Sequence, residues 1–242
     1  MRILDLFCGE GGAGMGYHRA GFDVVGVDHR RMNAYPFEFI RGDAVEYARQ
    51  HAHEFDAIHA SPPCKLFTPL QAVVPEEAPR LVDVDRHQNL IPPTRAVLQA
   101  SGLPWVMENV PRSPLLDPLI LCGSMFGLGA QVDDNRMQLR RHRLFESTEA
   151  LTPPGKCQHS GQAIGVYGRL SAWSGNLQRR PYGVGNPSCG SDGHRLDDPT
   201  RTIAGDPAGL HGAHRPAIAR RALRYVYCLD VMSSRVRDDG PQ

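Results

Sequence analysis

The sequence has no long hydrophobic run, no Cys-x-x-Cys pair, no internal repeat and no low-complexity tract. No apolar stretch approaches the roughly 18 residues that a membrane-spanning helix requires, and the first residues lack the pattern of a secretory signal peptide. The six cysteines are widely scattered, which is typical of free thiols in a reducing compartment. We therefore expect a soluble, cytoplasmic protein with no membrane-bound segment, and nothing points to an obligate protein partner.

Positive charge is concentrated in the second half of the chain. Residues 1–135 contain 11 Lys and Arg against 17 Asp and Glu, whereas residues 136–242 contain 16 against 9, so the two parts carry −6 and +7 and sum to +1. This distribution favours a phosphate-bearing partner that meets the carboxyl-terminal part. An ordinary solvated surface explains the charge equally well.

The amino-terminal segment has the pattern of a nucleotide-binding strand, loop and helix. An apolar strand over residues 2–7 is followed by five glycines within residues 9–16, and the helical stretch after them stops at Gly21. Glycines let the backbone approach a ligand, and the helix end offers free N–H donors. A second strand over residues 23–28 ends in Asp28, where an acidic side chain would hold a ribose hydroxyl.

Asp43 follows a third expected strand, over residues 37–40. Its side chain can cap a helix over residues 44–50 through a carboxylate oxygen. It can also bind a ligand, and the sequence favours neither role over the other.

Cys64 lies in the most distinctive stretch of the sequence. The segment Ser61-Pro62-Pro63-Cys64 follows a short apolar strand, and the two prolines prevent the chain from continuing as a helix. Cys64 is therefore expected on a stiff turn at the carboxyl end of a strand, where open α/β sheets place their chemistry. Taken alone, a cysteine is more often a packed core residue.

Two further segments place charged residues near this edge. A helix over residues 94–100 precedes a strand over residues 103–108, and Glu108 lies near the carboxyl end of that strand. Arg141 and Arg143 alternate along another expected strand and would point to one face.

Four segments together resemble the motifs of the DNA (cytosine-5)-methyltransferases, in particular small phage-type members. In chain order they read DLFCGEGG from Asp5, PPCKLFT from Pro62, ENV from Glu108 and RHRLF from Arg141. The resemblance covers about the first 150 residues, and four motifs in register are more specific than any one of them. It implies a DNA-associated enzyme of a bacterial or phage-infected cell, of the kind found in restriction-modification systems.

The resemblance assigns roles to particular residues. The catalytic residues would be Cys64, Glu108, Arg141 and Arg143. The residues that bind S-adenosylmethionine would be Asp5, Phe7, Gly9, Gly11, Gly12, Asp28, Asp43 and Pro63, with Asp43 contacting the adenine amino group. The proline-rich stretch over residues 69–93 would be a mobile loop that closes over double-stranded DNA.

The chemistry of cytosine explains these residue types. Carbon 5 is a weak nucleophile, so a thiolate must first add to carbon 6, a role that falls to Cys64. Glu108 would donate a hydrogen bond or proton to the ring nitrogen, and an arginine would stabilise charge on the exocyclic oxygen. The target base would have to be flipped out of the duplex.

Several features depart from the family pattern. Lys65 replaces the usual glutamine or asparagine and adds a cation that could lower the pKa of the Cys64 thiol. Leu139 replaces the glutamine of QxRxR, with Gln138 next to it, and the final family motif is not found. Three alternatives therefore stay open: transfer from a carboxylated S-adenosylmethionine, the same chemistry on RNA, and a catalytically inactive homologue that binds DNA.

The predicted fold class is α/β, with a doubly wound, mostly parallel sheet of the Rossmann-like methyltransferase type. Residues 1–148 would form the cofactor-binding and catalytic domain, and residues 149–242 a small, basic, irregular segment for target recognition. Cys157 and His159 could surround a zinc ion with Cys189 and His194, but this spacing matches no standard zinc motif. We therefore predict no metal site.

Overall fold

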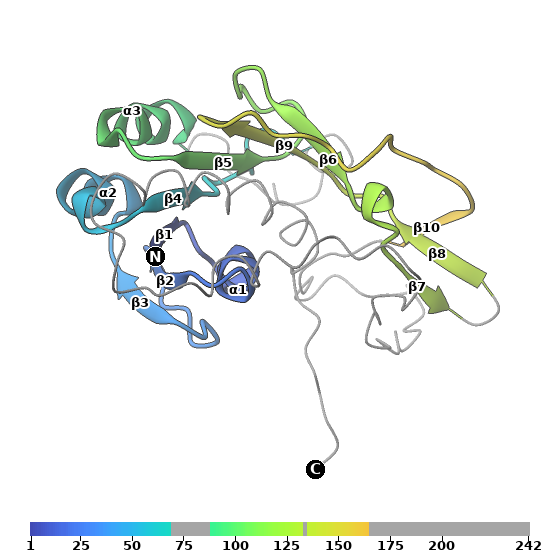
Figure 1. Ribbon diagram of the computed structural model, residues 1–242, viewed down its shortest axis with the longest axis horizontal. Helices are drawn as coiled ribbons and strands as arrows, with labels where there is room; N and C mark the ends of the chain where they lie inside the picture. The colour runs from blue at the N-terminus through green and yellow to red at the C-terminus, as the bar shows by residue number, and fades with distance from the viewer. Residues whose placement is uncertain (69–87, 133–134, 165–242) are drawn as a thin grey trace, which may run out of the picture.

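The computed structural model describes residues 1–68, 88–132 and 135–164 (Figure 1). Most of the stretch expected to close over DNA, and nearly all of the expected recognition segment, lie outside these residues. The helices are α1 (Gly12–Arg19), α2 (Ala44–His51) and α3 (Ile91–Ser101), with short 3-10 helices η1 (Ala52–Glu54) and η4 (Gly123–Phe126). The strands are β1 (Arg2–Leu6), β2 (Asp23–Asp28), β3 (Glu38–Arg41), β4 (Ala57–Ala60), β5 (Trp105–Asn109), β6 (Leu119–Cys122), β7 (Gly129–Val132), β8 (Asn135–Leu139), β9 (His142–Ser147) and β10 (Gln162–Ile164).

Seven strands form one twisted sheet in the order β3-β2-β1-β4-β5-β9-β6. The first five are parallel, and β9 runs antiparallel to both β5 and β6. The order reverses between β1 and β4, so the carboxyl ends of these two strands flank the position where open α/β sheets bind ligands. The predicted doubly wound, mostly parallel fold is confirmed.

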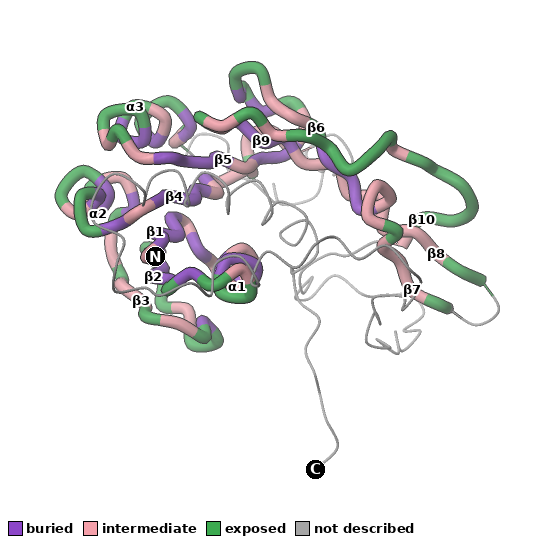
Figure 2. The backbone as a smooth tube through the Cα atoms, in the orientation of Figure 1, coloured by how far each residue is buried: buried purple, intermediate pink, exposed green. Residues whose placement is uncertain are grey.

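Helices cover both faces of this sheet (Figure 1). The apolar residues of α2 and α3 pack on one face in a cluster with Leu4, Ile58 and Met107. Tyr17 of α1 packs on the other face with Ile3 and Val106. Figure 2 shows that the buried residues follow the central strands, as expected for parallel strands covered on both sides. No helix in the part of the chain that the structure describes is long and apolar enough to span a bilayer.

A smaller sheet, which the sequence did not predict, lies beyond β6 (Figure 1). It contains β7, β8 and β10, with β8 between the other two. The pairing joins Gln162 of β10 to Met137 of β8, so the segment after residue 148 adds a strand to a hairpin that precedes it. The strands β7 and β10 have only four and three residues, too few to give a clear alternating pattern in the sequence.

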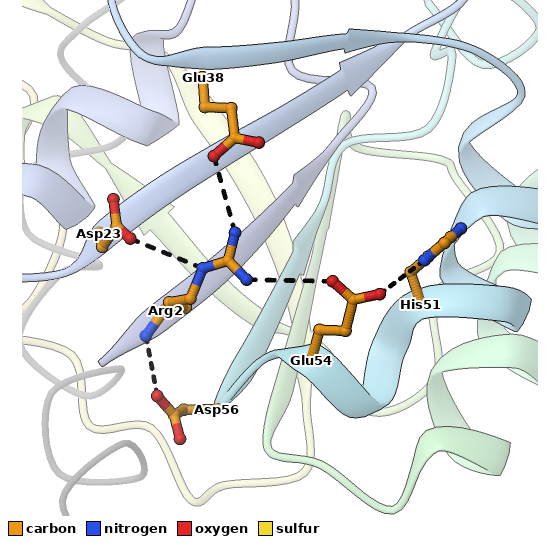
Figure 3. Close-up of polar contacts among 6 residues, drawn as sticks. All are labelled: Arg2, Asp23, Glu38, His51, Glu54 and Asp56. Atoms are coloured by element: carbon orange, nitrogen blue, oxygen red, sulfur yellow. Dashed lines mark hydrogen bonds and ion pairs between the residues drawn. The ribbon is translucent and has the colours of Figure 1, made fainter.

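The amino-terminal edge of the main sheet carries a cluster of charges around Arg2 (Figure 3). The guanidinium of Arg2 lies 3.6 Å from a carboxylate oxygen of Asp23, 3.6 Å from Glu38 and 4.0 Å from Glu54. The backbone N–H of Arg2 donates a 2.8 Å hydrogen bond to Asp56. Because Arg2 is 39% exposed, each ion pair contributes little stability. This edge is opposite to the one that bears the candidate site.

His59 is a fully buried polar side chain beneath the end of β4. Its ring nitrogens are hydrogen-bonded to the Tyr17 hydroxyl and to the Ser61 hydroxyl, each at 2.9 Å. Burial lowers the pKa of His59 to about 4, against a smaller opposing effect of the Glu108 charge. The imidazole is therefore neutral at physiological pH and ties α1 to the turn after β4.

Arg95 and Glu146 fasten α3 to β9. The Arg95 guanidinium makes two 2.7 Å contacts with the two oxygens of Glu146, and their side chains are only 14% and 7% exposed. Arg95 also donates to the carbonyl of Pro114, and Glu146 accepts from the N–H of Leu116. A bidentate pair of this kind leaves a costly buried charge when one partner is removed.

Replacing Arg95 with methionine should lower the free energy of unfolding by about 3 kcal/mol, because Glu146 then lacks its counterion. The control is Arg49→Ala, which breaks the exposed pair with Glu46 and should cost less than about 1 kcal/mol. Urea denaturation followed by circular dichroism measures both. Equal effects of the two variants would contradict the role assigned to the Arg95–Glu146 pair.

The His59 environment predicts a loss of stability in mild acid. An unfolded histidine binds a proton near pH 6.5, whereas folded His59 does so only near pH 4, so the unfolded state binds more protons in between. The free energy of unfolding should fall as the pH drops through this window, by about 2 kcal/mol at about pH 5. In urea titrations, His59→Gln should show a flatter pH dependence than the unmodified protein. The same dependence in both would contradict this account.

Candidate functional site

Four segments meet at the carboxyl edge of the parallel strands. The glycine-rich loop follows β1, Asp28 ends β2, the turn that carries Cys64 follows β4, and Glu108 lies next to the last residue of β5. Since β9 is antiparallel, its first residues return to this edge, and Arg143 comes just before the Leu144 that pairs with Asn109. The topology therefore brings together residues that are up to 138 positions apart, from Asp5 to Arg143.

The glycine-rich loop adopts a conformation that few residues tolerate. Phe7, Gly9 and Gly11 have φ values of 57°, 53° and 87°, and Gly11 immediately precedes the first turn of α1. The N–H of Gly9 donates a 3.2 Å hydrogen bond to the carboxylate of Asp28, and the N–H of Arg30 donates at 3.0 Å. The His29 ring nitrogen Nδ1 also lies 3.2 Å from this carboxylate, and a carboxylate can accept further hydrogen bonds from ligand hydroxyls. The glycine-rich loop and Asp28 therefore lie side by side.

Asp5 lies beneath this loop and is fully buried. The Tyr35 hydroxyl donates a 3.2 Å hydrogen bond to its carboxylate. A Cβ on Gly14 would lie 3.1 Å from that carboxylate, and a Cβ on Gly26 would lie 2.2 Å from the Tyr35 ring. Burial, reinforced by the Asp5 charge, raises the pKa of Tyr35, so its hydroxyl remains a donor. Asp5 therefore supports the loop from below, and Tyr35 is a part of this support that the sequence did not identify.

The other predicted cofactor residues lie nearby on the same edge. Gly12 begins α1, and Pro63 is in the turn before Cys64. Asp43 caps α2, one of the two roles that the sequence left open, because its carboxylate accepts a 2.8 Å hydrogen bond from the N–H of Glu46. The Asp43 side chain is exposed, so capping leaves it accessible to a ligand.

Asn109 holds the turn that presents Cys64. Its side-chain amide donates a 2.9 Å hydrogen bond to the carbonyl of Pro62, and its side-chain oxygen accepts from the N–H of Val110. Asn109 is 1% exposed, so this link between β5 and the turn is shielded from water. On the other side, Ser61 bonds through its N–H to the carbonyl of Leu6 at 3.1 Å. The sequence offered Asn109 only as the middle letter of a motif, without a role.

Glu108 and Arg143 form an ion pair at this edge. Arg143 Nε lies 2.8 Å from Glu108 Oε1, and the two side chains are 19% or less exposed. Arg143 Nη1 also donates to the carbonyl of His142 at 2.8 Å. The sequence placed both arginines on one strand, but β9 begins at His142, so Arg141 lies just before it. Only Arg143 is held by the strand itself.

Opposing charges act on the Cys64 thiol. Burial and the Glu108 carboxylate raise its pKa, while Arg143, a backbone hydrogen bond and Arg141 lower it, and the balance is upward. The pKa of Cys64 is therefore raised despite the two nearby guanidinium groups, because burial outweighs them. The charges of Glu108, Arg141 and Arg143 nevertheless all act on the Cys64 thiol, so the four predicted catalytic residues interact electrostatically.

Leu139 and Gln138, at and next to the position of the glutamine in QxRxR, make structural contacts in this chain. Leu139 belongs to β8 and packs on Gly123, where a Cβ would lie 2.5 Å from the Leu139 carbonyl. Gln138 bonds to Ser160 through both its amide and its carbonyl oxygen.

Comparison with known proteins finds structural similarity at low identity. A structure named as a DNA modification methyltransferase encoded within a prophage (E. coli) is 19% identical, over 60% of this chain and 45% of that chain, with a TM-score of 0.39. A DNMT2 mutant from Spodoptera frugiperda is 21% identical, over 67% and 54%, with a TM-score of 0.41. The Dnmt2 methyltransferase of S. pombe is 15% identical, over 60% and 47%, with a TM-score of 0.39.

The chain spans about half the length of these three structures. At these identities and scores the similarities assign neither a substrate nor a reaction. No protein-family model and no curated protein matches the chain.

Proposed function

We propose that this protein transfers a methyl group from S-adenosylmethionine to carbon 5 of cytosine in double-stranded DNA. The observation that carries the proposal is the arrangement at the carboxyl edge of the sheet. A thiol on a rigid turn is under the electrostatic influence of one carboxylate and two guanidinium groups. These are the groups that addition to a pyrimidine ring requires.

Cys64 is the proposed nucleophile. Its thiolate adds to carbon 6 of a flipped-out cytosine, the ring nitrogen gains a proton, and carbon 5 becomes electron-rich. After carbon 5 has accepted the methyl group, its proton leaves to a base and the thiolate is expelled, which restores the ring. The Asn109 bond to Pro62 supports this role because it fixes the turn against β5.

Glu108 and Arg143 would act together on the base. In the structure the arginine neutralises the carboxylate at 2.8 Å. When a cytosine enters, Arg143 or Arg141 would face the exocyclic oxygen, and Glu108 would bring a proton to the ring nitrogen. A protonated Glu108 no longer raises the pKa of Cys64, so the proton that activates the base also favours the thiolate.

The glycine-rich loop and Asp28 fit an adenosine-bearing cofactor. Gly9 has a left-handed φ and no heavy atom within 4 Å of the place of a Cβ, so the backbone is open there in front of α1, and Asp28 ends the adjacent strand. Asp28 and Asp43 would hold the ribose and the adenine, and Phe7, Gly12 and Pro63 would line the site. When bound, S-adenosylmethionine supplies an electrophilic methyl group.

DNA binding would fall to the basic second half of the chain, which lies mostly outside the described residues. Lys65 is exposed at the same edge as Cys64. This position keeps open the transfer of a larger group from a carboxylated S-adenosylmethionine.

Expression in a host without cytosine methylation, followed by nucleoside mass spectrometry of its DNA, tests the reaction. We expect 5-methylcytosine with the unmodified protein and none with Cys64→Ala. Cys228→Ala is the matched cysteine control, because Cys228 lies outside all four motif segments. A modification that survives Cys64→Ala would contradict the assignment. A different Cys64-dependent mass would identify another transferred group, and modified RNA alone would replace DNA as the substrate.

The charges around Cys64 predict opposite effects of two substitutions on thiol reactivity. Glu108→Gln removes a charge that raises the pKa of Cys64, so alkylation by iodoacetamide near neutral pH should be several-fold faster. Arg143→Met removes a charge that lowers this pKa, so alkylation should be slower. The rates are measured on the Cys64 peptide by mass spectrometry.

The control for this experiment is Glu38→Gln, which changes a carboxylate at the opposite edge of the sheet and should leave the rate unchanged. An unchanged or slower rate in Glu108→Gln would show that Glu108 does not act on the thiol.

A further inference from the structure

Two cysteines and two histidines meet at one end of the main sheet. Cys122 is the last residue of β6, and His142 is the first residue of β9, directly opposite it in the pairing of these strands. Cys157 and His159 lie in the segment between β9 and β10. One ligand atom from each of the four lies within 4.8 Å of all the others.

The distances within this group are close to those of a tetrahedral metal site. Cys157 Sγ lies 3.4 Å from His142 Nε2 and 2.8 Å from His159 Nε2, and Cys122 Sγ lies 3.4 Å from His159 Nε2. Around a zinc ion with Zn–S near 2.3 Å and Zn–N near 2.0–2.1 Å, tetrahedral geometry separates neighbouring ligand atoms by about 3.3–3.8 Å. Small side-chain movements would therefore bring all four atoms to bonding distance.

The type of ligand selects the metal. Two thiolates and two imidazoles suit zinc, whereas magnesium and calcium prefer oxygen ligands. Ser124 is placed to support the thiolates, with its hydroxyl 3.3 Å from Cys122 Sγ and 3.4 Å from Cys157 Sγ. Charge-assisted hydrogen bonds of this kind orient metal ligands.

The surrounding structure holds the loop in place. Gln138 of β8 makes two hydrogen bonds with Ser160, the residue after His159. Burial is graded across the four ligands: Cys122 is buried, His142 and Cys157 are half-buried and His159 is exposed. An ion could thus enter from the solvent side of the loop and be anchored from the sheet side.

We propose that Cys122, His142, Cys157 and His159 bind one zinc ion in a structural site. The sequence had grouped Cys157 and His159 with Cys189 and His194, which lie outside the described residues. The fold supplies Cys122 and His142 instead, because antiparallel pairing places them opposite each other. With four protein ligands the site is closed and serves as a clamp between the β6–β9 edge and the segment leading to β10.

The clamp lies next to the candidate active site along the chain. His142 separates Arg141 from Arg143, so a metal bond at His142 would fix the start of β9. The zinc site does not rest on the proposed methyl transfer, and its test below needs no activity.

The first measurement is the metal content of the full-length protein, purified without chelators and analysed by inductively coupled plasma mass spectrometry. We expect about one zinc per chain, as in other sites with four protein ligands. Replacement by cobalt should give the visible bands of a tetrahedral site and a thiolate-to-cobalt charge-transfer band. A metal-free protein, or cobalt spectra of an octahedral ion, would overturn the proposal.

Variants then identify the ligands. Cys157→Ser and His159→Gln should lose most of the zinc, and both residues lie outside helices and strands, so the fold should survive. Cys64→Ser and His53→Gln are the matched controls and should retain zinc, because neither residue belongs to the group. Full zinc content in Cys157→Ser would overturn the assignment. So would a chain lighter by two hydrogens with a Cys122–Cys157 disulfide in the native protein.

Discussion

The pairing of β9 with β5 determines the geometry of the candidate active site. Antiparallel pairing sets Phe145 opposite Glu108 and thereby brings Arg143 within 2.8 Å of the Glu108 carboxylate. A shift of one residue in this register would turn Arg143 to the other face of the sheet and leave Glu108 without this counterion. The Arg95–Glu146 pair, deeper along the same strand, holds β9 against α3 and helps to fix that register.

Two features of the site concern Cys64: hydrogen bonds hold the turn before it in place, and its surroundings keep the thiol protonated. Asn109 and Ser61 hold the turn before Cys64 from two neighbouring strands. Burial and Glu108 raise the pKa of the thiol, which favours its less reactive protonated form. Activation would then depend on a ligand that changes the charge of Glu108, so reactivity would be linked to the presence of the base.

The sequence predicted local features well and distant pairings poorly. Asp43 caps α2 through its carboxylate, a role that the local pattern offered. The parallel sheet also followed from alternating strands, helices and turns. The β7–β8 hairpin, the role of Asn109 and the group around Cys122 depend on strand pairing, which no local pattern of a single sequence reveals. The net direction of the Cys64 pKa could not be read from the neighbouring lysine, because it depends on how far the fold buries the thiol.

The most direct test of the central claim is to trap the enzyme on its substrate. Duplex DNA containing 5-fluorocytosine should be incubated with the protein and S-adenosylmethionine, because fluorine at carbon 5 prevents the final elimination of the thiolate. The account predicts a denaturation-resistant protein–DNA adduct that peptide mass spectrometry maps to Cys64 and that Cys64→Ser abolishes. DNA that binds without forming an adduct, or an adduct at another residue, would contradict it.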